Sequence, residues 1–117
     1  MNGETANDEM TEKIIGAAIE VHRLLGPGLL ESIYEEALCV ELRFRGISVQ
    51  RQVEIDVNYK GHIINGQRID LLVADEVIVE LKAVAHLPEV AVAQTLSYLK
   101  VTGLKRALLI ILASGSW

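Results

Sequence analysis

The sequence of 117 residues has little cysteine, proline and aromatic character, and it lacks long apolar runs. Its one cysteine, Cys39, excludes an internal disulfide and leaves no cysteine pair for a zinc site. The longest apolar run, residues 107–113, is too short to span a bilayer. The first ten residues lack the basic and apolar segments of a signal peptide. We therefore expect a cytoplasmic protein with no membrane association.

Half of the residues are apolar, which is typical of a globular chain, and the length suits one domain over residues 1–117. Because only 4% of the residues are aromatic, Leu, Ile, Val and Ala must form most of the core. The net charge of −5 argues against a broad electrostatic attraction to nucleic acid. It leaves room for a local basic strip beside an acidic site.

Apolar periodicity and Gly or Pro signals divide the chain into seven elements after a frayed lead over residues 1–7. The predicted helices cover residues 8–25, 31–45 and 88–101, and the predicted strands cover 47–59, 67–73, 77–84 and 105–112. Lys60-Gly61 and Asn65-Gly66 are both turn signals. The order ααβββαβ predicts an α/β (α+β) fold in which helices flank a mixed central sheet.

The hairpin around residues 74–76 carries the candidate chemistry. If its loop has three residues, Asp70 faces Glu80, and Lys82 shares their side of the sheet. Ile69, Leu71, Val79 and Leu81 then point the other way, into a core.

Two neighbouring carboxylates repel each other unless a cation or a proton lies between them. Mg²⁺ or Mn²⁺ suits such oxygen ligands, and a lysine beside the ion can position a water for attack on a phosphodiester. The alternative is a surface hairpin with a cross-strand ion pair, because acidic and basic residues two apart are common in strands.

Three further positions have both a functional and an ordinary interpretation. Glu31 begins the second helix at the border of its apolar side, and the ordinary interpretation is that it complements the helix dipole. Gln94 and Tyr98 share one face of the third helix, either as a half-exposed pair or beside a phosphate backbone. His22 is more readily interpreted as a satisfied or exposed histidine than as a ligand. The second helix is expected to turn one set of side chains to solvent: Ser32, Glu35, Glu36, Cys39 and Arg43.

Four separated motifs resemble one known family. Gly28 to Tyr34 matches the Gly-x-x-Glu-x-x-Tyr signature of the GxxExxY family, small prokaryotic proteins in the PD-(D/E)XK nuclease superfamily. Residues 19–23 and 79–83 also resemble that family, and residues 94–98 are similar to the Gln-x-x-x-Tyr motif of RecB-like nucleases. The likeness covers about residues 12–110.

The resemblance implies a restriction-endonuclease-like αβββαβ core with an extra N-terminal helix. It implies that Asp70 and Glu80 bind Mg²⁺, that Glu31 is an auxiliary ligand, and that Lys82 orients the attacking water. Gln94, Tyr98 and Tyr34 would contact substrate, and His22 would extend the site. The chain ends sooner after its last strand than is common in that family, so a sheet edge or groove wall is either missing or supplied by a partner.

Two hypotheses follow. The first is a Mg²⁺-dependent nuclease that hydrolyses DNA or RNA, with DNA preferred, by electrostatic stabilisation of the phosphoryl charge. The second is a non-catalytic module that keeps the fold and acts through a protein partner. A homodimer is also expected, from the thin core and an exposed sheet edge.

Overall fold

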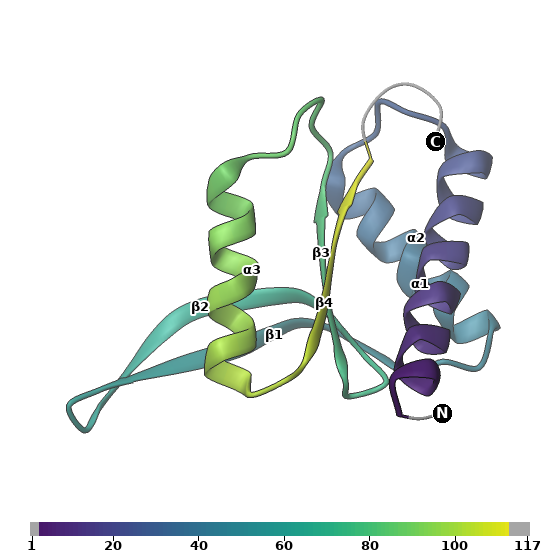
Figure 1. Ribbon diagram of the computed structural model, residues 1–117. Coiled ribbons are helices and arrows are strands. Elements are labelled where there is room, and N and C mark those ends of the chain that lie inside the picture. The colour runs from purple at the N-terminus through teal and green to yellow at the C-terminus, as the bar shows by residue number, and fades with distance from the viewer. Residues whose placement is uncertain (1–2, 113–117) are drawn as a thin grey trace.

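The computed structural model describes residues 3–112, with side chains from residue 9 onward. Its elements follow the predicted order (Figure 1): α1 Gly3–Leu25, α2 Glu31–Phe44, β1 Val49–Tyr59, β2 His62–Val73, β3 Val77–Lys82, α3 Glu89–Thr102 and β4 Arg106–Ile111. The expected lead is wrong for residues 3–7, which begin α1, because no glycine or proline interrupts residues 4–15. The rest of the lead and the end of the chain lie outside the described residues.

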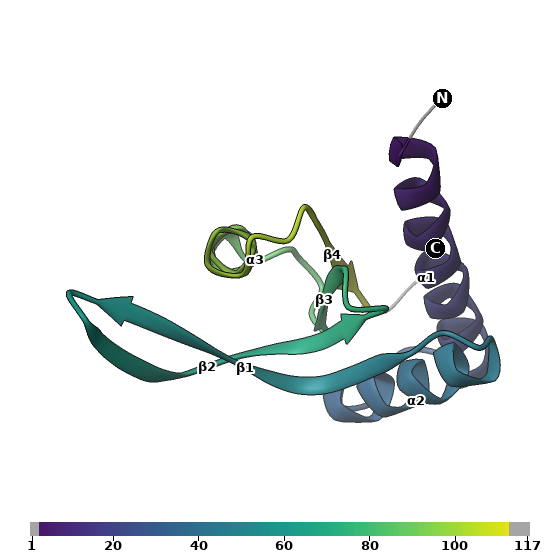
Figure 2. The same ribbon diagram turned by 90° about the horizontal axis from the view of Figure 1, so that it is seen from below.

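The four strands form one mixed sheet in the order β1-β2-β3-β4. The first three pair antiparallel, and β4 pairs parallel to β3 after the crossover through α3. Helices α1 and α2 lie on one side of β3 and β4, and α3 lies on the other (Figure 2). This arrangement confirms the predicted fold class. Within residues 3–112, no helix is long and apolar enough to cross a membrane.

Two apolar clusters fill the layers on either side of the sheet. The larger joins α1 and α2 to Leu71, Val79 and Leu81, and the smaller joins Ile55, Ile69 and Ile78 to Tyr98 of α3. Ile78 and Val79 are adjacent in β3 and enter different clusters, as strand alternation requires. Strand β3 is therefore covered on both faces, and every residue from Val77 to Leu81 is buried.

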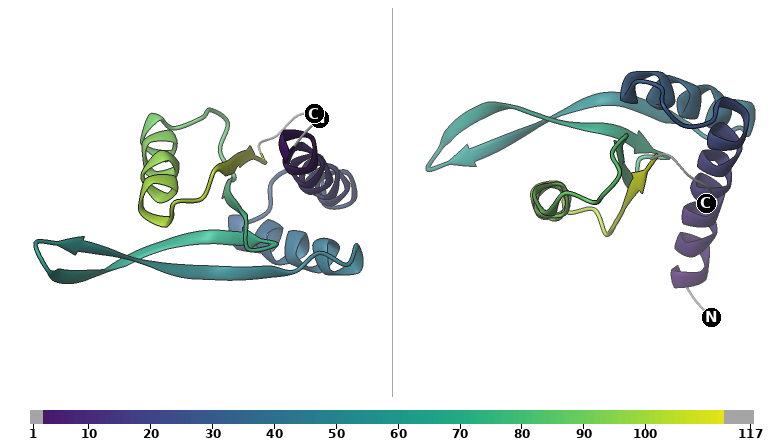
Figure 3. Two further views of the ribbon diagram at one scale, coloured as in Figure 1. Left: turned by 60° about the horizontal axis from the view of Figure 1, so that its bottom comes forward. Right: turned by 90° about the horizontal axis from the view of Figure 1, so that it is seen from above.

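The Asn65-Gly66 turn predicted from the sequence is wrong. Both residues lie inside β2, and the chain reverses at Lys60-Gly61, where Asn58 Oδ1 accepts the Gly61 N–H at 2.8 Å. The β1–β2 register shifts between Ile55 and Val57, and Gly66 has φ = 122°. Gly66 thus lies in a β-bulge and not in a turn; both are common positions for a glycine with positive φ. The result is a long two-stranded arm that extends beneath α3 (Figure 3).

The expected solvent side of α2 is wrong for Glu35 and Cys39, which are both buried. Helix α2 contacts α1 on one side and the sheet on the other, so its buried arc is wider than a single apolar stripe. Ser32, Glu36 and Arg43 are not buried.

Candidate functional site

The β2–β3 hairpin has the predicted three-residue loop. Leu71 pairs with Val79, Leu72 with Ile78 and Val73 with Val77, across a loop in which Ala74 and Asp75 are left-handed. One residue beyond the last pair, the Asp70 N–H donates to a carboxylate oxygen of Glu80, so the two residues adjoin each other as the sequence predicts.

Beyond the last ladder pair, the carboxylates of Asp70 and Glu80 accept two backbone N–H groups across the strands. Glu80 Oε2 accepts the Asp70 N–H at 2.7 Å, and Asp70 Oδ2 accepts the Leu81 N–H at 2.8 Å. The paired register ends at Leu71 and Val79, and from there β2 and β3 run in different directions (Figure 1). We call the place where Asp70, Glu80 and Lys82 lie the fork. Each carboxylate is fixed through one oxygen, and its second oxygen takes no part in this pair of bonds.

The electrostatics of the fork centre on Glu80, which is only 5% exposed. Burial raises the pKa of Glu80 to about 7, the bond from the Asp70 N–H opposes this, and the charge of Asp70 raises it further. Lys82 lowers the pKa of Glu80, which is consistent with its expected place two residues along on the same side of β3. Near neutral pH the buried Glu80 carboxyl therefore exchanges its proton.

Backbone strain lies directly opposite Asp70. Gln52 has φ = 51° in the middle of β1, between the pairs Arg51–Leu71 and Val53–Ile69. The other non-glycine residues with positive φ in the described chain are in turns: Lys60, Ala74 and Asp75. A left-handed residue inside a strand is costly and often marks a functional site.

This strained position coincides with a change of face in the strand pair. Ile69 packs in the cluster of Tyr98, whereas Leu71 packs against α1 and α2. The prediction that Ile69, Leu71, Val79 and Leu81 share one core is therefore wrong for Ile69, which packs in the other cluster, next to the irregular backbone of β1 at Gln52.

Glu31, at the start of α2, bonds the end of β3 next to the fork. Its Oε2 accepts the N–H of Ala83 at 3.1 Å, one residue after Lys82. The cap position of α2 is Leu30, which makes no side-chain cap bond. The Glu31 carboxylate thus ties α2 to the end of β3, in addition to its favourable place in the first turn.

Sequence reasoning missed a further carboxylate near the fork, that of Glu35. It accepts a hydrogen bond from Arg51 Nε at 3.1 Å and one from Gln52 Nε2 at 3.0 Å. Its charge also raises the pKa of Glu80. The available signal was its spacing, since Glu35 lies one turn after Glu31 and shares its side of α2.

The remaining predicted residues lie on α3 and near the end of α1. Tyr98 is buried, and burial together with the charges of Glu80 and Asp70 raises its pKa; Gln94, one turn earlier, is exposed. His22 is buried near the end of α1.

Tyr34 is not available to substrate. It is fully buried, its hydroxyl donates to Gly26 O at 2.6 Å, and it accepts the Leu29 N–H at 3.1 Å. The tyrosine of the signature therefore holds the α1–α2 loop in place.

The described residues contain no group of three or more His, Cys, Asp or Glu side chains close enough to hold a metal ion. Asp70, Glu80 and Glu31 are thus not gathered as a three-carboxylate centre. The pair Asp70 and Glu80 nevertheless fits a hard divalent ion, because Mg²⁺ usually binds through one or two carboxylates and keeps several waters. A buried carboxylate that ionises only near pH 7 also favours a compensating cation.

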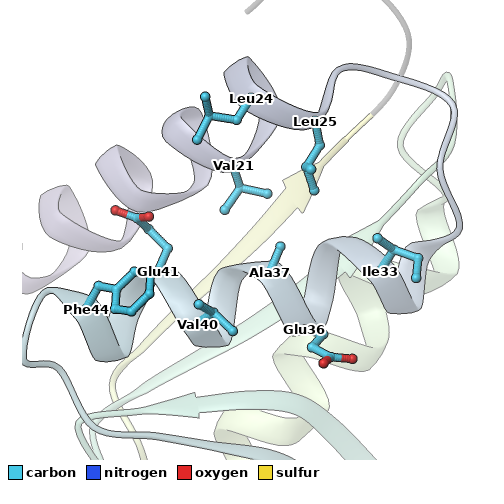
Figure 4. Close-up of a pocket in the computed structure, with 9 residues that line it drawn as sticks. All are labelled: Val21, Leu24, Leu25, Ile33, Glu36, Ala37, Val40, Glu41 and Phe44. Atoms are coloured by element: carbon cyan, nitrogen blue, oxygen red, sulfur yellow. The ribbon is translucent and has the colours of Figure 1, made fainter.

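A hollow of about 500 Å³ lies between α1 and α2 (Figure 4). Apolar side chains line most of it, and Glu36 and Glu41 are the charged members of its lining. It lacks convergent polar groups among the described residues, so the fork is the better candidate for chemistry.

A mixed sheet with flanking helices and an acidic pair at the end of its central hairpin defines a restriction-endonuclease-like fold. In agreement, the family model for the PD-(D/E)XK nuclease superfamily matches residues 8–114, and the chain belongs to this superfamily. Comparisons with curated proteins and with solved structures find no match.

Proposed function

We propose that this protein is a metal-dependent nuclease that hydrolyses a phosphodiester of nucleic acid, preferably DNA, in the cytoplasm of a prokaryote. The narrower resemblance to the GxxExxY family belongs to the same proposal. Its main support is the pair of bonds at the fork, in which Glu80 accepts the Asp70 N–H and Asp70 accepts the Leu81 N–H. The charges of Asp70 and Lys82 both act on Glu80 there.

In this proposal Asp70 and Glu80 hold Mg²⁺ or Mn²⁺. When bound, the ion supplies positive charge that lowers the pKa of a water and neutralises the phosphoryl oxygens. The Lys82 ammonium holds the attacking water by a hydrogen bond and aligns it with the phosphorus. Glu31, which accepts the Ala83 N–H, would be an auxiliary ligand in this proposal.

Substrate contacts in this proposal come from α3. Gln94 is exposed on α3, so a nucleic-acid backbone approaching from the α3 side would meet it first. Tyr98 is buried one turn later, so its contact with substrate requires the backbone to come close to the carboxylates. His22 stays a prediction of the resemblance, and Tyr34 has no part in substrate binding because its hydroxyl is occupied.

The second candidate is a non-catalytic module acting through a protein partner. Two observations favour it: the net charge of −5, and the lack of a three-ligand cluster within the described residues. A nucleic-acid surface is usually basic.

A cleavage assay separates the two candidates. Single-stranded, duplex and branched DNA, and an RNA, are incubated with the protein and Mg²⁺ or Mn²⁺, beside the Lys82→Ala and Glu80→Gln variants. The nuclease requires metal-dependent cleavage that both variants lose. Cleavage that survives Lys82→Ala, or no cleavage by the parent protein with either metal, contradicts the proposal.

A further inference from the structure

The outer edge of β4 has the sequence of an interior strand. Residues 107–112 are all apolar, with no charge or proline to discourage pairing. Strand β3, which has a neighbour on each side, is buried from Val77 to Leu81, whereas most of β4 is only half-buried. Within residues 3–112, β4 is the last strand of the sheet and pairs only with β3.

Apolar hollows flank this edge on both faces. On the α1 side, Ile15 and residues 108–111 line one hollow, and on the α3 side, Leu87, Leu96 and Leu109 help to line another. Leu96 is 60% exposed. Figure 2 shows β4 between α3 and α1, with β3 on one side only. A strand added here would have both of its faces covered, so it must be apolar on both.

The backbone of β4 offers a regular set of outward groups to such a strand. The Leu112 N–H donates inward to Lys82 O at 2.8 Å. Since successive residues of a strand turn their N–H and C=O groups to opposite sides, Ala107, Leu109 and Ile111 direct theirs outward.

We propose that β4 pairs antiparallel with β4 of a second copy of this chain, with the two-fold axis at Leu109. Leu109 then faces its own counterpart, and Ala107 faces Ile111 in both directions, which uses the outward groups of all three residues. Among the described strands β4 itself fits the required occupant. The exposed positions of β1 and β2 carry charged side chains such as Arg51, Glu54 and Arg68, and β3 is interior.

Charge selects the antiparallel register. Lys105 and Arg106 lie at the start of β4. A parallel, in-register pair would place each beside its own copy, and like charges directly opposite destabilise a sheet. In the antiparallel register the two basic ends lie at opposite ends of the interface. The two Arg106 residues are then about 20 Å apart along the strands.

The dimer would join two four-stranded sheets into one. Glu80 pairs with Leu109 in the β3–β4 register, so both forks lie level with the axis. They open on the same face, roughly 14 Å apart, which is three strand spacings. This consequence for substrate rests on the proposed function, while the pairing itself does not.

Disulfide trapping tests the register. A Leu109→Cys variant, in which the native Cys39 is buried and cannot interfere, should form a crosslinked dimer under mild oxidation. Residues paired directly across strands are about 5.5 Å apart between Cα atoms, within disulfide range. The matched control is Lys105→Cys, whose counterpart would be roughly 27 Å away and should stay monomeric on a denaturing gel. Crosslinking at Lys105 without crosslinking at Leu109 overturns the register.

Sedimentation tests the interface. The parent chain should approach twice its mass of 12.9 kDa as concentration rises from low micromolar to its solubility limit. Leu109→Lys and Leu109→Pro should remain monomeric, and the proline removes an outward N–H without breaking a bond to β3. Val40→Lys, in the α1–α2 hollow, should still dimerise.

A monomer at every concentration, or a dimer that only Val40→Lys disrupts, contradicts the proposal. Circular dichroism of each variant shows whether it is folded. If Leu109→Pro does not fold, the disulfide trapping with Leu109→Cys still tests the proposal. Loss of nuclease activity plays no part in either readout, so failure of the dimer is distinct from failure of the proposed function.

Discussion

Replacing Glu80 by Gln should make the metal-free protein more stable at alkaline pH. Gln keeps an oxygen that can accept the Asp70 N–H, and it removes the buried negative charge. The pKa of Glu80 lies at about 7 in the folded protein, against 4.5 for an ordinary glutamate. The folded state therefore binds this proton more tightly than the unfolded state does.

Proton linkage gives the direction and the size of the stability difference between the parent protein and Glu80→Gln. The stabilising effect of the Glu80 proton is fully present below about pH 4.5 and is lost as pH rises through about 7. At 1.36 kcal/mol per pKa unit, the parent chain loses about 3 kcal/mol over this range relative to Glu80→Gln. The two proteins should have similar free energies of unfolding near pH 4.5 and differ by that amount at about pH 8.5.

Urea unfolding in the presence of EDTA, at several pH values between these limits, measures the difference. The control is Glu76→Gln, in the exposed loop of the same hairpin, which should follow the parent protein at every pH. A gap between Glu80→Gln and the parent that does not change with pH would refute the assignment of Glu80 as a buried, reluctantly ionised carboxylate.

Three further predictions concern neighbouring residues. Arg51→Ala should lower the free energy of unfolding, measured in urea, by about 2 kcal/mol, because it leaves the buried Glu35 carboxylate with fewer partners. Adding Glu35→Gln to this variant should recover part of the loss, because it removes the buried charge. Tyr34→Phe should cost about 1–2 kcal/mol through two lost loop hydrogen bonds, yet leave cleavage per folded molecule unchanged. Lys82→Ala should abolish cleavage while the Mg²⁺-induced rise in melting temperature persists; loss of both would contradict a role confined to the attacking water.

The hairpin register is predictable from the sequence because it depends on local features. A three-residue loop and strand alternation together fix which residues face each other, and these two features alone place Asp70 opposite Glu80. The extended course of β2 is not predictable in this way. Lys60-Gly61 and Asn65-Gly66 carry similar turn signals, and only the pairing of the whole arm assigns one to the turn and the other to a bulge.

Glu35 shows why part of the site escapes prediction. A helical wheel assumes one apolar side, and it assigns Glu35 to solvent. The structure buries this carboxylate because α2 is covered by both α1 and the sheet, and because Arg51 and Gln52 arrive from β1 to bond it. The spacing from Glu31 places Glu35 on the same side of α2, but its burial depends on partners from a distant strand, which the sequence of the helix does not reveal.

Calorimetric titration with Mn²⁺ at about pH 8, where Glu80 is mostly ionised, tests most directly whether the fork seats a divalent cation. The parent protein should bind one ion per chain, Glu76→Gln should match it, and Glu80→Gln and Asp70→Asn should each lose the binding heat. Absence of binding by the parent, or binding that survives both substitutions, would contradict a metal centre at the fork.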